Sequence, residues 1–156
     1  MILYLVRHGE AVPETGDSQR KLSPKGRDDV ARVSADLKRR GAAIEAFWHS
    51  SKARARETAG ILRDVLAPGR GIEEKGFLSP DDPPGSAARE IRDLRRDLLI
   101  VSHIPFLPRL VSLLVTDGED KNIVHMPTAA VVVLEGAAHQ PWTITAVITP
   151  SGLSHG

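Results

Sequence analysis

Two histidines and two arginines stand where short apolar runs of the chain end, or where a helix follows such a run. Arg7 and His8 directly follow the first apolar run, and His103 comes two residues after a later one. Arg54 stands near the start of the helix that the pattern predicts after the second run. Because ligands bind at the carboxyl edge of a parallel sheet, we expect these four side chains to converge on one crevice.

This combination of side chains suits a phosphoryl group. Arginine offers planar, permanently charged donors that match phosphoryl oxygens in pairs, and helix N-termini add backbone N–H groups to an anion site. A neutral imidazole can attack phosphorus as a covalent catalyst. Since phosphoryl transfer needs mainly positioning and neutralisation of charge, we expect the chemistry to need neither a metal nor another cofactor. No two histidines have the spacing of a helical zinc site.

The elements that must position these residues alternate along the chain. Short apolar runs predict strands, and apolar residues at helical spacing predict helices between them. Ser23 and Pro24 are typical of a helix start, and Gly41 is typical of its end. We therefore predict an α/β domain with a mainly parallel central sheet, the first two strands near its centre and the last two paired. The predicted strands are 2–6, 44–48, 98–101, 130–134 and 142–148, and the predicted helices are 24–40, a segment around 58–66, 87–96 and 104–115.

The composition narrows the function classes. Of the 156 residues, 41% are hydrophobic, which is enough for the core of one domain. The formal net charge of +1 gives no reason to expect nucleic acid or an anionic membrane as a partner. The chain has no cysteine, which excludes cysteine nucleophiles and thiolate metal sites.

The ends of the chain carry no targeting pattern. The apolar N-terminus stops at Arg7 without the features of a signal peptide, and no apolar run approaches the ~20 residues of a membrane helix. We therefore expect a cytoplasmic protein with one domain over residues 1–150. We expect the tail from Pro150, including 151–156, to be frayed, and His139 and His155 to be surface or tail residues.

Three motifs resemble those of the histidine phosphatase superfamily, which has the phosphoglycerate-mutase-like fold. Residues 5–10, LVRHGE, resemble its signature, and residues 101–103, VSH, resemble its third motif. Residues 50–59, SSKARARETA, resemble the second motif, S-P-x-x-R-A-x-Q-T-A, with Ser51 for the usual proline and Glu57 for the usual glutamine. Segments 16–23 and 102–105 look like the SixA-type phosphohistidine phosphatases. The three motifs in this order, each at a strand end, are specific, and the resemblance extends from residue 2 to about residue 134.

The resemblance implies a fold and a set of roles. The fold would be a three-layer α/β/α sandwich. His8 would be the nucleophile that carries the phosphoryl group as phosphohistidine. Arg7, Arg54 and His103 would hold the phosphoryl oxygens, and Arg20 lies where this branch places a further phosphate-contacting arginine.

A leaving-group acid is missing from this pattern. Larger family members carry an acidic residue after the second helix, but the loop 77–84 offers no convincing match. Asp17 and Asp81 are the candidates, and Asp17 is more typical of a residue that caps its loop or pairs with an arginine. Because imidazole has a conjugate-acid pKa near ~6.5, whereas an alkoxide is far more basic, a weak acid site favours phosphohistidine over a phosphate ester as the substrate.

Other polar residues have simpler interpretations. Glu10 is expected to orient the loop or His8, and His49 is expected to pack. His125 is a secondary candidate for a contact with the ligand. The charged run around 89–96 is typical of a solvated helix face.

The sequence thus predicts a metal-independent phosphatase that acts on phosphohistidine in a protein, such as a phosphorelay component. The alternatives are a phosphatase of a small phosphorylated metabolite and, from a different class, a phospho-binding module without turnover. The intact His8 argues against the binding module, since a pure binder needs no nucleophile. A mutase is also disfavoured, because this short chain has little material for a lid.

Overall fold

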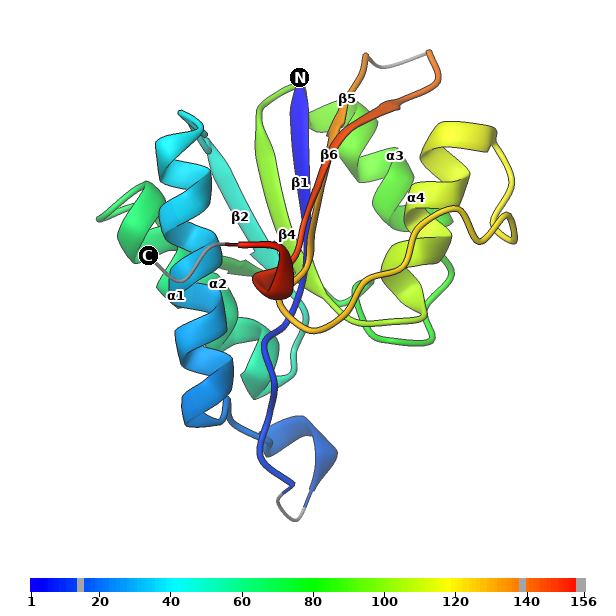
Figure 1. Cartoon of the computed structure of the whole chain (residues 1–156). Coiled ribbons are helices and arrows are strands. Elements are labelled where there is room, and N and C mark those ends of the chain that lie inside the picture. The colour runs from blue at the N-terminus through cyan, green and yellow to red at the C-terminus, as the bar shows by residue number, and fades with distance from the viewer. Residues whose placement is uncertain (14–15, 138–139, 154–156) are drawn as a thin grey trace.

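The computed structural model describes residues 1–13, 16–137 and 140–153, and within them the chain forms a six-stranded sheet and four α-helices (Figure 1). The strands are β1 (Ile2–Arg7), β2 (Ala46–His49), β3 (Glu73–Glu74), β4 (Leu98–Ser102), β5 (Val131–Glu135) and β6 (Thr143–Ile148). The α-helices are α1 (Pro24–Arg39), α2 (Ala53–Leu66), α3 (Gly85–Leu94) and α4 (Phe106–Thr116), and short 3-10 helices cover Asp17–Gln19 and Pro150–Gly152.

The sheet has the order β3-β2-β4-β1-β5-β6. The first four strands in this order are parallel, whereas β5 runs antiparallel to both β1 and β6. The predicted α/β class with a mainly parallel sheet is therefore confirmed, as is the pairing of the last two strands. The prediction that the first two strands lie near the centre is confirmed, since β1 is one of the two central strands and β2 lies beside the other, β4, which separates them. All of β4 is buried, so its apolar run takes the position with a neighbouring strand on each side.

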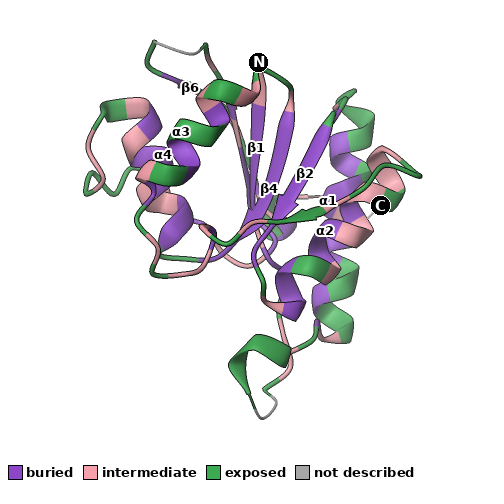
Figure 2. Cartoon of the chain, turned by 180° about the vertical axis from the view of Figure 1, so that it is seen from behind, coloured by how far each residue is buried: buried purple, intermediate pink, exposed green. Residues whose placement is uncertain are grey.

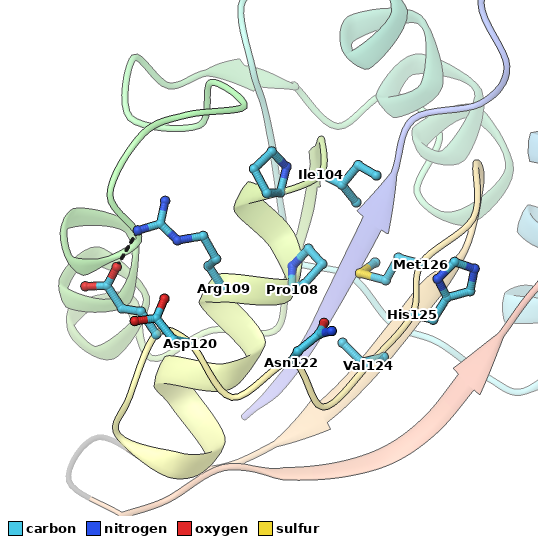
Figure 3. A pocket seen from close by; sticks show the side chains of 10 residues that line it. Ile104, Pro108, Arg109, Asp120, Asn122, Val124, His125 and Met126 are labelled. Atoms are coloured by element: carbon cyan, nitrogen blue, oxygen red, sulfur yellow. Dashed lines mark hydrogen bonds and ion pairs between the residues drawn. The ribbon is translucent and has the colours of Figure 1, made fainter.

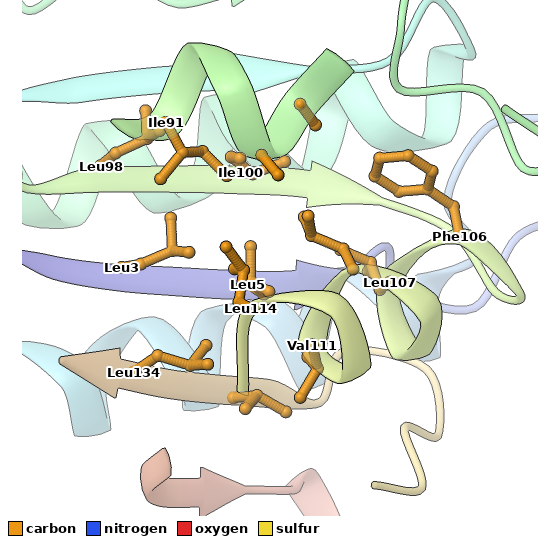
Figure 4. Packing of buried hydrophobic residues seen from close by; sticks show 14 of the residues in the cluster. Leu3, Leu5, Ile91, Leu98, Ile100, Phe106, Leu107, Val111, Leu114 and Leu134 are labelled. Atoms are coloured by element: carbon orange, nitrogen blue, oxygen red, sulfur yellow. The ribbon is translucent and has the colours of Figure 1, made fainter. Parts of the chain in front are cut away.

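Helices cover both faces of this sheet and bury its side chains in two cores. Helices α3 and α4 lie on one face, where Leu5, Ile100 and Leu107 are fully buried in one cluster (Figure 4). Helices α1 and α2 lie on the other face, where Val6 and Leu62 belong to a second cluster. Successive residues of a strand point to opposite faces, so β1, β2, β4 and β5 contribute to both cores, and β1, β2 and β4 are buried along most of their length (Figure 2). This arrangement confirms the three-layer α/β/α sandwich.

Two features differ from the sequence expectation. Strand β3 consists only of Glu73–Glu74, whose side chains are exposed, so it has no apolar pattern to predict it. The chain does not fray at Pro150, because the Thr149 side chain caps a 3-10 helix there and Arg32 Nη2 donates to the Pro150 carbonyl at 2.9 Å. The rest of the predicted tail, 154–156 with His155, and the predicted surface residue His139 lie outside the described residues.

Within the ranges that the structure describes, none of the helices combines the length and the apolar character that a membrane span requires.

Candidate active site

The four side chains predicted to converge do so at the carboxyl edge of β1, β2 and β4. His8 directly follows β1, His103 follows β4, and Arg54 lies in the first turn of α2. The ring centroids of His8 and His103 are 5.0 Å apart, and Arg54 Nε lies 3.4 Å from His8 Nε2. One phosphoryl group can therefore reach both imidazoles on hydrogen-bond lengths.

The two ring nitrogens of His8 have different surroundings. Nδ1 lies 2.6 Å from the carbonyl oxygen of Gly9, which can only accept a hydrogen bond, so Nδ1 carries the proton. Nε2 is then the unprotonated nitrogen, and it accepts the long hydrogen bond from Arg54. The lone pair that a nucleophile needs is therefore on Nε2, the nitrogen that lies beside the arginine.

Burial and positive charge favour neutral His8. The imidazole is 8% exposed, and burial, followed by the charges of Arg54, Arg7 and Arg20, lowers its pKa to about 4 against the opposing hydrogen bond to Gly9. His8 is consequently neutral at pH 7 and does not need to lose a proton before it attacks.

His103 is held by Ser50, a residue of the second motif. The Ser50 Oγ lies 2.6 Å from His103 Nε2 and also accepts the backbone N–H of Lys52 at 3.3 Å. The hydroxyl proton is thus free to point at Nε2, which leaves the proton of neutral His103 on Nδ1. Burial, followed by the charge that His8 carries once it is protonated in acid, lowers the pKa of His103 to about 3, so this ring is also neutral at pH 7.

Two buried nitrogen atoms of the cluster have no protein partner. Arg7 Nε and His103 Nδ1 lack a hydrogen bond within the described part of the chain. The Arg7 Nη1 donates to the Met126 carbonyl at 3.0 Å, which fixes the guanidinium beside the site. Since buried polar groups are nearly always bonded, these two N–H groups are suited to an oxyanion bound between them.

Asp17 does not have the properties of a proton donor. Its carboxylate forms ion pairs with Lys52 at 3.0 Å and Arg54 at 3.4 Å, and its carbonyl accepts Arg54 Nη1 at 2.7 Å. The hydrogen bond from Lys52 and the nearby positive charges lower its pKa despite some desolvation. The proposal that Asp17 is the leaving-group acid is therefore not supported, because the group is ionised at neutral pH.

Arg20 is engaged mainly with its own loop. Its Nε donates to the Val12 carbonyl at 3.0 Å and its Nη2 to the Ala11 carbonyl at 3.5 Å, while Nη1 lies 3.7 Å from Asp17. Its charge nevertheless contributes to the lowered pKa of His8. Contact between Arg20 and phosphate therefore stays a prediction.

The turn that carries His8 fits closely against the start of α1. A Cβ on Gly26 would clash with the Glu10 backbone, and a Cβ on Gly9 would lie 2.9 Å from the Gly26 carbonyl. The Glu10 side chain accepts from the hydroxyl of Ser23 at 2.7 Å, and Ser23 also caps α1. Glu10 thus orients the loop, as its sequence context suggests. The Gly9 N–H donates to Thr58 Oγ1 at 3.1 Å, which ties this turn to α2.

The glutamate that departs from the second motif has a structural function. Glu57 Oε1 accepts the Leu22 N–H at 2.9 Å and pairs with Arg27 at 3.2 Å. A glutamine oxygen could accept the same backbone N–H, but the pairing with Arg27 gains from the charge. The substitution therefore strengthens the attachment of α2 to the loop without reaching His8.

The remaining predicted residues lie around this centre. Asp81 is exposed and forms no hydrogen bond or ion pair within the described ranges, so its role as an acid stays a prediction. Its loop does adjoin the site, because the hydroxyl of Ser102, the last residue of β4, donates to the Leu78 carbonyl at 2.7 Å. His49 is buried with Nδ1 2.8 Å from the Ser50 carbonyl, as expected for a packing residue. His125 is exposed on the rim of a neighbouring cavity.

Sequence reasoning missed two residues of the centre, Ser50 and Lys52. Both lie inside the second motif, only a few positions before Arg54, but a serine and a lysine at a helix start also occur as ordinary capping and surface residues. Their roles become apparent only from their contacts with His103 and Asp17, which come from distant parts of the chain. Across the described residues, no three histidine, aspartate or glutamate side chains are grouped so as to hold a metal ion.

Comparison with known proteins supports the resemblance. Residues 3–75 match the model of the histidine phosphatase superfamily (branch 1), a range that includes the motifs with His8 and Arg54. The protein histidine phosphatase SixA, solved with tungstate, has a TM-score of 0.92 at 24% identity, with 99% of this chain and 100% of that chain covered. The putative phosphohistidine phosphatase SixA from Agrobacterium tumefaciens has a TM-score of 0.79 at 20% identity, with 96% of this chain and 98% of that chain covered.

The same fold also occurs in a protein with a different named substrate. A putative α-ribazole-5′-P phosphatase from Escherichia coli K-12 has a TM-score of 0.80 at 15% identity, with 96% of this chain and 98% of that chain covered. No curated protein sequence gives a significant match. The resemblance to histidine phosphatases and the phosphoglycerate-mutase-like fold are thus confirmed, while these identities do not select a substrate.

Proposed function

We propose that this protein is a phosphatase in which His8 Nε2 takes a phosphoryl group from phosphohistidine in another protein and passes it to water. The observation that carries the proposal is the hydrogen bond between His8 Nδ1 and Gly9, 2.6 Å long, in a cluster of cationic side chains. This bond places a lone pair on Nε2 in neutral His8. A binding module without turnover would need no such nucleophile.

In the first step, Nε2 of His8 forms a bond to phosphorus while the bond from phosphorus to the substrate's imidazole nitrogen breaks. Arg7, Arg54 and His103 donate hydrogen bonds to the phosphoryl oxygens and offset their negative charge. One N–P bond replaces another, so the two sides of this step are similar in energy. The substrate imidazole keeps the bonding electron pair and leaves neutral when its second nitrogen already carries a proton.

In the second step, water attacks phosphorus and the bond to His8 breaks. Phosphorylated His8 still has its Nδ1 proton, so the ring is cationic and the Gly9 carbonyl stabilises that charge. The imidazole therefore leaves neutral without receiving another proton, and the proton of the water goes to solvent. Inorganic phosphate is released and the starting enzyme is restored.

The choice of phosphohistidine follows from the leaving group. A serine alkoxide needs a positioned acid, which typically contributes ~10²–10⁴-fold to the rate. Asp17 is held ionised by Lys52 and Arg54, and Asp81 is exposed. An imidazole leaving group makes no such demand, so the same site still serves it.

A small phosphate ester is the second candidate substrate. The fold is shared with the α-ribazole-5′-P phosphatase, and a cavity of about 380 Å³ beside the candidate site has room for a small organic group. Such a substrate would require an acid from the loop 77–84, with Asp81 as the first candidate.

The test compares kcat/KM for a phosphohistidine peptide, a matched phosphoserine peptide and an aryl phosphate. We expect the phosphohistidine peptide to be preferred by at least ~10²-fold over the phosphoserine peptide, because only the ester needs the missing acid. Equal or faster turnover of phosphoserine would contradict the proposal. Acid-labile labelling of His8 during turnover would identify the nucleophile independently of substrate choice.

Metal independence forms part of the same proposal. Arg7 and Arg54 supply permanent positive charge at the site, so catalysis should continue after treatment with EDTA. Loss of turnover in EDTA that returns on addition of a divalent ion would refute this part, without affecting the assignment of His8.

A further inference from the structure

A cavity of about 380 Å³ opens between α4 and the segment that leads into β5 (Figure 3). Its walls are apolar in part, where Ile104, Pro108, Val124 and Met126 line them, and polar or charged elsewhere. Ile104 is 42% exposed, and with Ile123 and Val147 it is one of the few large hydrophobic residues that are exposed within the described residues. A hollow of this size with apolar walls and a few polar groups is typical of a binding site.

The cavity lies next to the candidate active site. Ile104 is the residue after His103, and the Met126 carbonyl accepts the hydrogen bond from Arg7 Nη1 at 3.0 Å. In Figure 3, Ile104 and Met126 lie at one end of the hollow, beside the end of β1. A group that enters the cavity from this end can therefore belong to the same molecule as a phosphoryl group at His8.

The opposite end of the cavity is acidic. Arg109 and Asp120 lie there (Figure 3), and Arg109 pairs with Glu119 at 2.7 Å. Glu119 is thus already neutralised, whereas the Asp120 carboxylate forms no hydrogen bond or ion pair within the described ranges. The free charge in the hollow is negative, which disfavours a second anionic group of a phosphorylated metabolite.

A long cationic side chain complements both parts of this hollow. Lysine and arginine bury their hydrocarbon stems along apolar surface and keep the charged head at a polar end. The stem would lie along Ile104, Pro108 and Val124, and the head would reach Asp120. Glutamate would be repelled there, and an uncharged aliphatic chain would gain only the apolar contact.

We infer that this cavity binds a lysine or arginine of the substrate protein that lies near its phosphohistidine. The inference rests on the proposed function, since it assigns the residues that flank the phosphorylated side chain. All phosphohistidine proteins present the same phosphorylated side chain to the phosphate site, so that site alone cannot distinguish them. Contact with a flanking residue gives the enzyme a means to select among them.

The test uses synthetic phosphohistidine peptides with one variable residue, scanned from four positions before to four positions after the phosphohistidine. At each position the peptide carries lysine, norleucine or glutamate, so that stem and charge are separated. For at least one position we expect kcat/KM in the order lysine, norleucine, glutamate, with lysine favoured about two- to five-fold, the range for an exposed charge pair.

Variants of the enzyme then assign the preference to the cavity. Asp120→Asn should abolish the advantage of lysine over norleucine, and Asp120→Lys should favour glutamate instead. Glu135→Gln is the control, because Glu135 is exposed and lies opposite Ile2 at the amino-terminal end of β1, away from the cavity, so the substitution should change no preference. Turnover of phosphoramidate, which has no flanking residue, should be equal in all four proteins.

The outcomes separate this inference from the proposed function. If the wild-type enzyme hydrolyses the peptides but shows no preference for lysine, or if the preference persists in Asp120→Asn, the assignment of the cavity is wrong and the phosphatase activity stands. If the wild-type enzyme hydrolyses no phosphohistidine peptide, the proposed function fails and the inference fails with it.

Discussion

Acidification from pH 7 to pH 5 should destabilise the protein, with a large part of the loss due to its two buried histidines. His8 has a pKa lowered to about 4 and His103 a pKa lowered to about 3, from the ordinary value of 6.5. At pH 5 both are protonated in the unfolded chain but neutral in the folded one. Because the unfolded state then binds more protons, stability is complete above pH 6.5 and declines as the pH falls toward the folded pKa values.

The size of the loss follows from these values. Between pH 7 and pH 5, the linkage relation gives about 2 kcal/mol of unfolding free energy lost for each histidine. The pH is kept at 5 or above so that carboxylates stay largely ionised. A domain of this size has a total stability of roughly 5–15 kcal/mol, so the effect is well within what urea unfolding resolves.

The assay is urea unfolding at the two pH values for the wild-type chain, His8→Asn and His103→Asn. Each variant should lose about 2 kcal/mol less than the wild type on acidification, because asparagine does not titrate, and the double variant should lose least. Other titrating groups are common to all the proteins and cancel in the comparison. If His8→Asn shows the same loss as the wild type, His8 is not buried as a neutral base, and the proposal that it waits as a nucleophile at neutral pH is refuted.

Further predictions concern the site and its support. His8→Ala should abolish both turnover and the acid-labile phosphoenzyme while circular dichroism stays unchanged; remaining phosphoenzyme would identify another nucleophile. Arg54→Ala should lower kcat and raise KM, because the charge acts in the ground and transition states alike. Asp17→Asn should lower the inhibition constant of orthovanadate several-fold, since it removes a carboxylate that competes for Arg54; an unchanged constant would contradict this. Gly26→Ala should reduce stability by about 1–3 kcal/mol through the clash with the neighbouring backbone. Gly60→Ala in α2, where a Cβ meets open space, should instead raise stability by up to about 1 kcal/mol in the same urea assay.

The position of the site was predictable because its residues lie directly after strands. Arg7 and His8 come directly after a fully apolar run, and His103 comes after another, so two buried strands place them without any knowledge of loop conformation. The start of α1 was predictable for a similar local reason, since Ser23 accepts the Gly26 N–H and Pro24 follows it. Such features depend on a few neighbouring residues and a general rule of sheet geometry.

Other features depend on partners that are distant in the sequence. The position of β4 between β1 and β2 is a property of the whole sheet, and apolar runs of similar composition do not reveal their order. Asp17 was a candidate acid because the sequence of a polar loop does not show which groups contact an aspartate or how they shift its pKa. The further lowering of its pKa comes from Lys52 and Arg54, which approach it from another motif.

The state of Asp17 also explains how a site of this charge remains stable without substrate. Arg54 Nε donates to the unprotonated Nε2 of neutral His8, and the Arg54 side chain is largely buried. Its positive charge therefore needs an anion nearby. Asp17 supplies that anion from the loop that also carries Arg20, and the pairing of Asp17 with Lys52 adds a second contact. An incoming phosphoryl group offers more oxygens and more charge than one carboxylate, so it can take over Arg54 while Asp17 keeps Lys52. Binding of substrate then requires only a local exchange of partners for Arg54, which suits the proposed function, in which the site accepts a histidine carried on another protein.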